Sequence, residues 1–345
     1  MRAKLFFWSG IGLALLVVSM VISLSIGSAG IAVGEVWRIL LHHLPVVGER
    51  VAADWQPSSE QIVVMVRLPR VLLAMLVGAC LSLAGAGFQG VLRNPLADPY
   101  TLGVAAGAAV GASLLMLLGL HYKLLGMWTI PATAFLTGML SLFLVLRLAG
   151  TQGRFQIETL ILSGVVMQAF LGSVVSFMVS LSDDVVNEIV FWLLGSLAMR
   201  GWSFQPILAV WLAAGFAVLL AFARALNIFA LGERQAAHLG ISVERVKLTV
   251  LIVATFLTAA AVSVVGIIGF VGLVVPHLVR LMAGPDYRLL IPMSVLFGAV
   301  YVLWADTLAR TLLSPTEIPL GVMTAFLGAP FFAWLLRKSK RMIGG

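Results

Sequence analysis

Residues 71–92 read VLLAMLVGACLSLAGAGFQGVL and contain no charged side chain. A helix needs about 20 consecutive, mostly apolar residues to cross a bilayer, so this stretch predicts a membrane-spanning helix. The whole chain has the same character, with 61% hydrophobic residues, 10% charged residues and a mean hydropathy of +1.09. A soluble domain carries roughly a quarter of its residues as charged side chains. We therefore expect an all-α, polytopic membrane protein.

Similar apolar runs, none with more than one charged residue, recur along the chain and predict ten spans, at about 5–27, 71–92, 100–120, 124–146, 160–182, 201–223, 248–267, 268–283, 289–308 and 318–336. The first run is too long for a signal peptide and is expected to be retained. We divide 248–283 because Gly266, Gly269, Gly272 and Pro276 weaken helix continuity. The run 189–199 is too short to span, so it predicts an interfacial or re-entrant helix.

Basic residues are distributed unequally between the two sides of these spans. With a cytoplasmic N-terminus, 15 of the 22 Lys and Arg but only 5 of the 14 Asp and Glu fall on the inside, in 1–4, 93–98, 147–159, 224–247, 280–288 and 337–345. The positive-inside rule then places both termini in the cytoplasm. The basic pI of about 10.2 thus indicates topology and contact with anionic membrane lipid, and we expect no nucleic-acid partner.

One segment is an exception to this charge distribution. The polar outer loop, about 28–70, ends in Arg67 and Arg70, two cations on the side where anions prevail. Positive-inside is a statistical preference, so such an exception invites a functional explanation. We expect both arginines, with Arg310 near another outer span end, to be exposed to a docked protein or to lipid headgroups.

The spans lack the groups that other transport mechanisms and membrane enzymes use. No Asp, Glu, Lys or Arg lies near the centre of a span, where proton- and sodium-coupled carriers usually place an ionisable group. The chain has no G-x-x-x-x-G-K-[ST] motif, no Ser-His-Asp set, and no third ligand beside His42 and His43. We therefore expect no catalytic residue, no metal site and no cofactor in this chain, and an energy source on a partner.

The third predicted span carries glycines at every fourth position, namely Gly103, Gly107 and Gly111. This spacing puts all three on one face of a helix and lets a second helix approach closely. We expect packing within the subunit rather than a pore lining.

A polar turn, RNPLADPY at 93–100, joins the second and third spans. Its two prolines stop one helix and start the next, and Asn94 and Asp98 are residues that cap exposed backbone groups. The pattern predicts a tight turn on the cytoplasmic side.

A second polar segment, about 224–247, contains LGERQAAHLG at 231–240. It predicts a short helix from about Glu233 to Leu239 with Gly240 as its C-cap, and another helix from about Val243. The small residues among charges suit docking into a partner's groove, but a helix on the membrane surface would have the same pattern. The residues leave both alternatives open.

Four separated motifs resolve this ambiguity through a family resemblance. RNPLADPYTLGVAAG at 93–107, the 231–240 segment, GIIGFVGLVVPHLVR at 266–280 and IPLGVMTAFLGAP at 318–330 resemble the permeases of ABC importers for iron–siderophore complexes, haem and cobalamin. The resemblance covers about residues 60–337. It implies a type II ABC importer permease with ten spans, forming a single transmembrane domain over 1–345.

The resemblance also implies partners and a location. It implies a second permease copy, in a homodimer, two ATPase subunits that hold ATP and Mg, and an extracytoplasmic substrate-binding protein. The chain is expected in the cytoplasmic (inner) membrane. The first expectation for the cargo is an iron chelate, as a siderophore or haem, with cobalamin as the alternative. An ATP-independent secondary carrier is the rival from another class.

Residue roles follow from the same resemblance. The coupling helix that contacts the ATPase matches Gly232, Glu233, Ala236, Ala237, Leu239 and Gly240. The positions that narrow the cytoplasmic end of the path match Asn94 and Leu96, and those that face acidic side chains of the binding protein match Arg67, Arg70 and Arg310. The pair Ile157-Glu158 aligns with a second gate position but departs from the small hydroxyl residues usual in the cobalamin permease.

Overall fold

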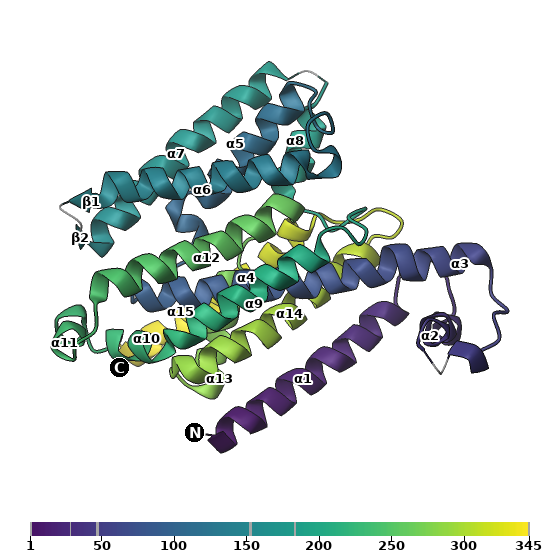
Figure 1. Ribbon diagram of the computed structural model, residues 1–345, viewed down its shortest axis with the longest axis horizontal. Helices are drawn as coiled ribbons and strands as arrows, with labels where there is room; N and C mark the ends of the chain where they lie inside the picture. The colour runs from purple at the N-terminus through teal and green to yellow at the C-terminus, as the bar shows by residue number, and fades with distance from the viewer. Residues whose placement is uncertain (1, 28, 46–47, 152–153, 183, 344–345) are drawn as a thin grey trace.

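The chain folds as a bundle of helices with one short pair of strands (Figure 1). The computed structural model describes residues 2–27, 29–45, 48–151, 154–182 and 184–343, with residues 2, 151, 154–155 and 334–343 described by their backbone. The expected all-α class is confirmed. The single pair of strands found in this described part joins two residues each, at 150–151 and 154–155, in antiparallel register.

The helices follow one another along the chain with short connections. They are α1 (Arg2–Ser25), α2 (Val33–His42), α3 (Pro57–Gln61), α4 (Leu68–Val91), α5 (Val104–Leu117), α6 (Thr129–Ala149), α7 (Ile157–Leu181), α8 (Val186–Leu194), α9 (Gln205–Ala221), α10 (Ala223–Phe229), α11 (Glu233–His238), α12 (Val243–Val265), α13 (Val271–Ala283), α14 (Tyr287–Thr311) and α15 (Leu320–Ile343). The strands are β1 (Gly150–Thr151) and β2 (Arg154–Phe155). Short 3-10 turns lie at Gly48–Arg50, Pro99–Leu102 and Gly126–Trp128.

Length and composition identify the helices that can cross a membrane. Within the described residues, 6 helices are long and apolar enough to cross a membrane, and the bent pair of α9 and α10 makes a seventh candidate. Three shorter apolar helices are α5, α13 and the Leu320–Ala333 part of α15. Each of the ten expected spans overlaps one of these elements. The count of ten itself stays a prediction because α5, α13 and the Leu320–Ala333 part of α15 are each shorter than 18 residues.

The expected outer loop 28–70 is largely helical, which the sequence pattern did not predict. It contains α2 and α3, and α3 continues through a π-helical stretch, Ile62–Arg67, into α4. The resulting helix runs from Pro57 to Val91. Proline is tolerated in the first helical turn, so a polar segment can start a helix that later becomes a span. Arg67 and Arg70 therefore stand on a helix that packs inside the bundle.

Helix α4 lies at the centre of the bundle and packs against α9, α12, α13 and α14. The contact depends on small residues, because a Cβ added at Gly78 would collide with the carbonyl oxygen of Gly298, and one at Gly85 with that of Gly272. Close approach of backbones is how apolar helices gain packing energy where no water drives them together.

The glycine face of α5 packs against α6. A Cβ at Gly107 would lie 2.7 Å from Thr137 O and from Ser141 Cβ, and one at Gly111 would collide with the Thr137 hydroxyl. The expectation that these glycines serve packing within the subunit is confirmed.

The break expected within 248–283 is confirmed. Helix α12 ends at Val265, Gly266 has φ +79° and Phe270 has φ +68°, and α13 begins at the next residue. Left-handed φ values interrupt a right-handed helix. Pro276, in contrast, lies inside α13 and does not end it. The run 189–199 gives the short helix α8, whose placement at the membrane surface stays a prediction.

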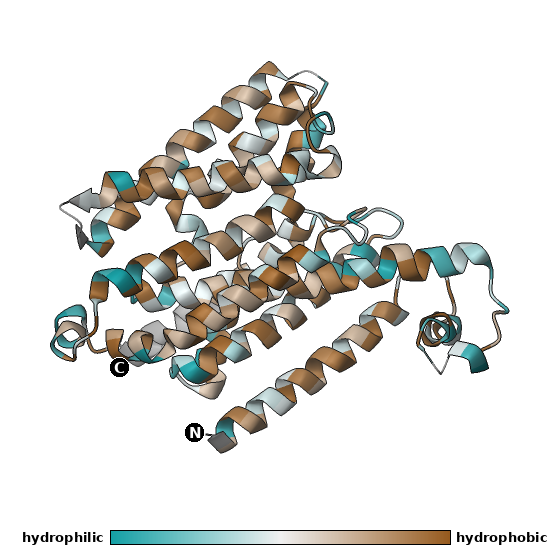
Figure 2. Cartoon of the chain, viewed as in Figure 1, coloured by the Kyte–Doolittle hydropathy of each residue, from teal (hydrophilic) through white to brown (hydrophobic). Residues whose placement is uncertain are grey.

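Polar residues gather at the two ends of the bundle and apolar ones cover its middle (Figure 2). One end carries α2 and α3, which we call the outer end, and the other carries α11, which we call the α11 end (Figure 1). Helix α1 begins and α15 ends at the α11 end (Figure 1). Both ends of the chain thus share one side, as an even number of spans requires.

Candidate functional site

The short helix expected at about Glu233–Leu239 is present as α11, Glu233–His238. Glycines with positive φ flank it, Gly232 at +116° and Gly240 at +82°. The N–H of Gly240 donates to Ala237 O and that of Ile241 to Ala236 O, which closes the C-terminal turn. Helix α12 then begins at Val243, also as expected.

Only part of α11 is available to a partner. Ala236 is fully buried within its own chain, whereas Ala237 is exposed and Leu239 is 62% exposed. Helix α11 packs the Ala236 methyl group inward, and contact of Ala236 with an ATPase stays a prediction. Glu233 accepts a hydrogen bond from Lys247 Nζ at 2.7 Å, and this ion pair fixes α11 to α12.

A cavity of about 580 Å³ at the α11 end brings together three segments that are far apart in the sequence. Arg93 comes from the turn after α4, Ile157 and Glu158 from the start of α7, and Leu231–Gln235 from the α11 segment. The sequence motifs predicted each segment separately but not that they share one cavity.

The turn 93–98 has the capping contacts expected of it. Asn94 Oδ1 accepts from the N–H of Leu96 at 2.9 Å, and Asp98 Oδ1 accepts from that of Tyr100 at 2.8 Å. Burial raises the pKa of Asp98 to about 6, and the Tyr100 N–H opposes this shift. Leu96 is 47% exposed, an apolar side chain at the tip of a polar turn.

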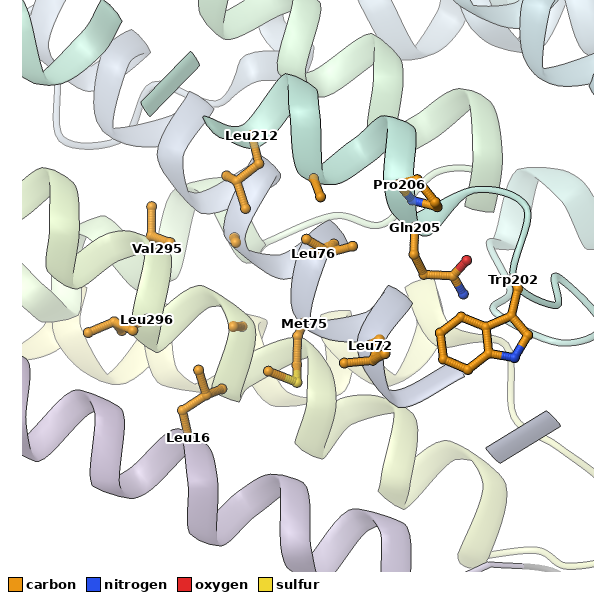
Figure 3. A pocket seen from close by; sticks show the side chains of 13 residues that line it. Leu16, Leu72, Met75, Leu76, Trp202, Gln205, Pro206, Leu212, Val295 and Leu296 are labelled. Atoms are coloured by element: carbon orange, nitrogen blue, oxygen red, sulfur yellow. The ribbon is translucent and has the colours of Figure 1, made fainter. Parts of the chain in front are cut away.

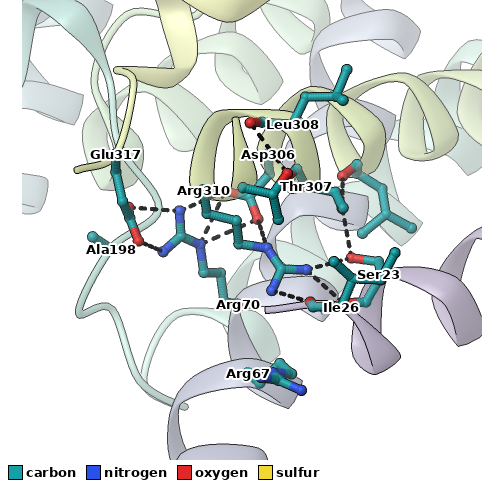
Figure 4. A network of polar contacts seen from close by, with 12 residues as sticks. Ser23, Ile26, Arg67, Arg70, Ala198, Asp306, Thr307, Leu308, Arg310 and Glu317 are labelled. Carbon is teal, nitrogen blue, oxygen red and sulfur yellow. Dashed lines mark hydrogen bonds and ion pairs between the residues drawn. The ribbon is translucent and has the colours of Figure 1, made fainter. Parts of the chain in front are cut away.

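At the outer end, a charged cluster joins α1, α4, α14 and the loop before α15 (Figure 4). Arg70 donates from Nε and Nη2 to Asp306 Oδ1 at 3.0 and 2.8 Å, and from Nη1 and Nη2 to the Glu317 carboxylate at 2.8 and 2.9 Å. Asp306 is fully buried, whereas the Glu317 side chain is 36% exposed. Bidentate contacts of this kind are the stronger class of ion pair.

The other two arginines of interest bind backbone carbonyls near the end of α1. Arg67 donates to Leu24 O at 3.0 Å and to Ala29 O at 3.2 Å, and Arg310 donates to Ile26 O at 2.7 Å and to Ser23 O. A helix leaves its last carbonyl oxygens without hydrogen-bond donors. The guanidinium groups of Arg67 and Arg310 donate to two of these oxygens, those of Leu24 and Ser23.

These contacts correct the expectation that the three outer arginines are exposed. Arg67 and Arg310 are each 5% exposed and the Arg70 side chain is 12% exposed. Because α4 begins inside the supposed loop, its arginines point into the bundle rather than away from it. Docking of a binding protein at these arginines is untested and stays a prediction.

Sequence reasoning missed the partners Asp306 and Glu317. Asp306 stands four residues before Arg310, and Arg310 Nε lies 3.5 Å from its carboxylate. An acid followed by a base at i+4 in an apolar helix is a readable signal for an ion pair on one face. Glu317 lies in a connecting loop, and no sequence pattern indicated its contact with Arg70.

An apolar cleft of about 440 Å³ opens between α1, α4, α9 and α14 (Figure 3). Its lining is mostly apolar and includes Leu16, Met75 and Leu296, together with the polar side chain of Gln205. The Gln205 amide donates to Pro69 O at 2.8 Å and to Gly201 O. The lining has no charged group, so the cleft offers no ion-pair partner to an anionic cargo. Among the described residues, no group of three or more His, Cys, Asp or Glu side chains could hold a metal ion.

An apolar helical bundle with polar segments at both ends has the architecture of a multi-pass membrane protein. The chain belongs to the FecCD transport family, whose model matches residues 15–338. The expected family and its ABC transporter permease architecture are thereby confirmed.

Three relatives illustrate the family. The chain is 43% identical over 332 residues to an uncharacterised ABC transporter permease, YvrB, of Bacillus subtilis, covering 96% of this chain and 93% of the relative. It is 42% identical to the cobalamin import permease BtuC of Halobacterium salinarum, covering 81% and 75%. It is 40% identical to the ferric dicitrate permease FecD of Escherichia coli, covering 92% and 98%.

A solved structure shares the fold. A metal-chelate type ABC transporter in an inward-facing conformation matches with a TM-score of 0.82 at 33% identity, covering 98% of this chain and all of that one.

Proposed function

We propose that this chain is the membrane-spanning subunit of an importer for an iron chelate, driven by separate ATPase subunits and fed by an extracytoplasmic binding protein. Family membership supports the importer class, and the metal-chelate type of the structural relative and the ferric dicitrate relative favour an iron cargo. The chain supplies the path, and hydrolysis takes place on the partner.

The observation that carries the coupling part of this proposal is the cavity at the α11 end. Helix α11 is joined to α12 by the Glu233–Lys247 ion pair, and it shares the cavity with Arg93 and the start of α7. An ATPase that moves α11 would move α12 as one body, and the turn 93–98 borders the same space. Rigid shifts of packed helices are the usual form of such transitions.

A second copy of the chain completes the path in this proposal. Leu96 is exposed in one protomer, and Asn94 holds its turn in place through the Leu96 N–H. We place the path on the two-fold axis, with Leu96 of each copy narrowing its cytoplasmic end. A homodimer is the simplest assembly because C2 is the commonest oligomer symmetry.

The cluster around Arg70 suggests how a binding protein would engage the outer end. Glu317 occupies one side of the Arg70 guanidinium and is partly exposed, so an acidic side chain of a docked protein would compete with it. In that case, Glu317→Gln frees Arg70 and speeds association at low salt. Unchanged association rates would leave Arg70 with an internal structural role alone.

Cobalamin is the alternative cargo, favoured by the cobalamin import relative. The experiment is uptake by the chain reconstituted with its ATPase and binding protein, offered a labelled ferric siderophore, haem or cobalamin in turn. The proposal expects ATP-dependent uptake of an iron chelate. Uptake of cobalamin alone would show that the cargo is cobalamin and that the chain is still an importer subunit. Uptake at the same rate with and without ATP would favour a secondary carrier.

A further inference from the structure

A second cavity at the α11 end, of about 330 Å³, lies between the end of α4, α10, the end of α13 and the start of α14. Its polar lining consists of Gln89, Arg93, Arg280 and Tyr287. It is separate from the cleft of Figure 3, and it shares Arg93 with the larger cavity of the α11 end. The question is what a cavity with two guanidinium groups would bind.

The charge of this cavity is positive and not compensated by its own lining. Neither Arg93 nor Arg280 has a carboxylate within ion-pair distance among the described residues. The acid nearest to Arg280 along the chain, Asp286, accepts from Arg288 at 2.7 Å and from Asn227 at 2.7 Å. These hydrogen bonds, led by that of Arg288, lower the pKa of Asp286 to about 2, so its charge is already balanced.

Arg280 is held in place by hydrogen bonds. Arg280 Nη1 donates to Gln89 Oε1 at 3.0 Å, and Gln89 Nε2 in turn donates to Gly272 O and Leu273 O at 3.2 Å each. Arg280 Nη2 lies 3.5 Å from the Tyr287 hydroxyl. Such a relay fixes the plane of the guanidinium and leaves Nε and the remaining Nη donors for another acceptor.

Arg93 reaches the same cavity from a conformation that non-glycine residues rarely adopt, with φ +50°. It also borders the larger cavity, whose carboxylates Glu158, Glu233 and Glu244 form no ion pair with it among the described residues. Left-handed backbone at a residue with a long side chain costs free energy and is concentrated at functional sites.

From these observations we propose that this cavity binds an anionic phosphate group between Arg93 and Arg280. Guanidinium groups match the geometry of phosphate oxygens and bind them through paired hydrogen bonds. The phosphate could belong to an anionic phospholipid or come from solution, and the chemistry of the cavity is the same for both. Basic pockets between membrane helices on the cytoplasmic side are a recurrent site for anionic headgroups, so the lipid is the expected source. This proposal does not depend on the cargo or on the ATPase.

The test uses the full chain purified in detergent, without transport. Native mass spectrometry compares retention of phosphatidylglycerol with that of phosphatidylcholine, and a separate arm measures the shift in unfolding temperature on adding inorganic phosphate. The variants are Arg93→Gln and Arg280→Gln. Arg224→Gln is the matched control, because Arg224 is exposed on α10 and lies outside the cavity lining.

The expected result is preferential retention of phosphatidylglycerol by the wild type and by Arg224→Gln, with a loss of about tenfold in each cavity variant, since a charge-assisted hydrogen bond is worth about that much. A phosphate-dependent shift without lipid retention, lost in the cavity variants, would assign the site to phosphate from solution. Arg93→Gln lies on an exposed turn, so it remains informative if Arg280→Gln fails to fold. No preference in either arm, or an equal loss in Arg224→Gln, would overturn the proposal.

Discussion

Asp306 has no exposed surface and contacts the guanidinium groups of Arg70 and Arg310. Removing one member of a buried ion pair leaves the other charge without compensation, which costs about 3–5 kcal/mol. Asp306→Asn should therefore lower the unfolding temperature strongly. Glu317→Gln removes a partly exposed partner and should cost only about 0–1 kcal/mol.

Thermal unfolding of both variants in detergent, monitored by circular dichroism, checks this ranking. Equal stability of Asp306→Asn and wild type would show that the cluster does not hold α1, α4 and α14 together.

The two alanines of α11 differ in a way that the sequence did not reveal. Ala237 is exposed, so Ala237→Arg should leave the chain folded while it weakens copurification with the ATPase. Ala236 is buried, so Ala236→Arg would place an unpaired charge in the bundle, cost several kcal/mol and reduce the yield of folded chain. Ala237→Ser is the control for a change of size without charge. Normal ATPase copurification by folded Ala237→Arg would exclude this face of α11 from docking.

At the scale of elements, the packing of α4 against α13 depends on backbone contact at Gly85. A Cβ there would collide with the Gly272 carbonyl oxygen, so Gly85→Ala should destabilise the bundle by about 1–3 kcal/mol. Gly172 also lies inside a helix, but nothing within 4 Å would meet its Cβ, and Gly172→Ala should be neutral or stabilising. Similar unfolding temperatures for the two variants would contradict the packing assigned to α4.

The elements also show what the sequence could and could not predict. Each long apolar run became a helix, because hydrocarbon forces a chain to satisfy its backbone hydrogen bonds internally. The helix breaks at Gly266 and Gly240 could be predicted from the glycines themselves. The start of a helix at Pro57 could not be predicted, because polarity alone does not distinguish a loop from the exposed first turns of a spanning helix.

The sequence predicted which segments form the candidate site, but not which residues contact one another there. The motifs identified the turn 93–98 and α11, whose bounds the structure confirms. The outer arginines were recognised as an anomaly in charge, but their exposure was misjudged because their acceptors, Asp306 and the carbonyls ending α1, are distant in the sequence. The shared cavities follow from the tertiary fold alone.

At the scale of the whole molecule, we propose that the chain is one component of an assembly. The bundle is apolar in its middle and polar at both ends (Figure 2), and among its described residues no group of three or more His, Cys, Asp or Glu side chains could hold a metal ion. Both ends of the chain lie at the α11 end (Figure 1), which in our proposal faces the cytoplasm and the ATPase. The outer end, with the Arg70 cluster, would then face the binding protein.

The most direct measurement of this claim is cargo uptake into proteoliposomes that hold the chain alone, the chain with its ATPase, or the chain with an ATPase variant that binds but does not hydrolyse ATP. Binding protein and labelled ferric chelate are present in all three. If the chain is the permease of an ATP-driven importer, uptake occurs only with the active ATPase and ATP. Uptake of equal rate by the chain alone, driven by an ion gradient, would contradict it.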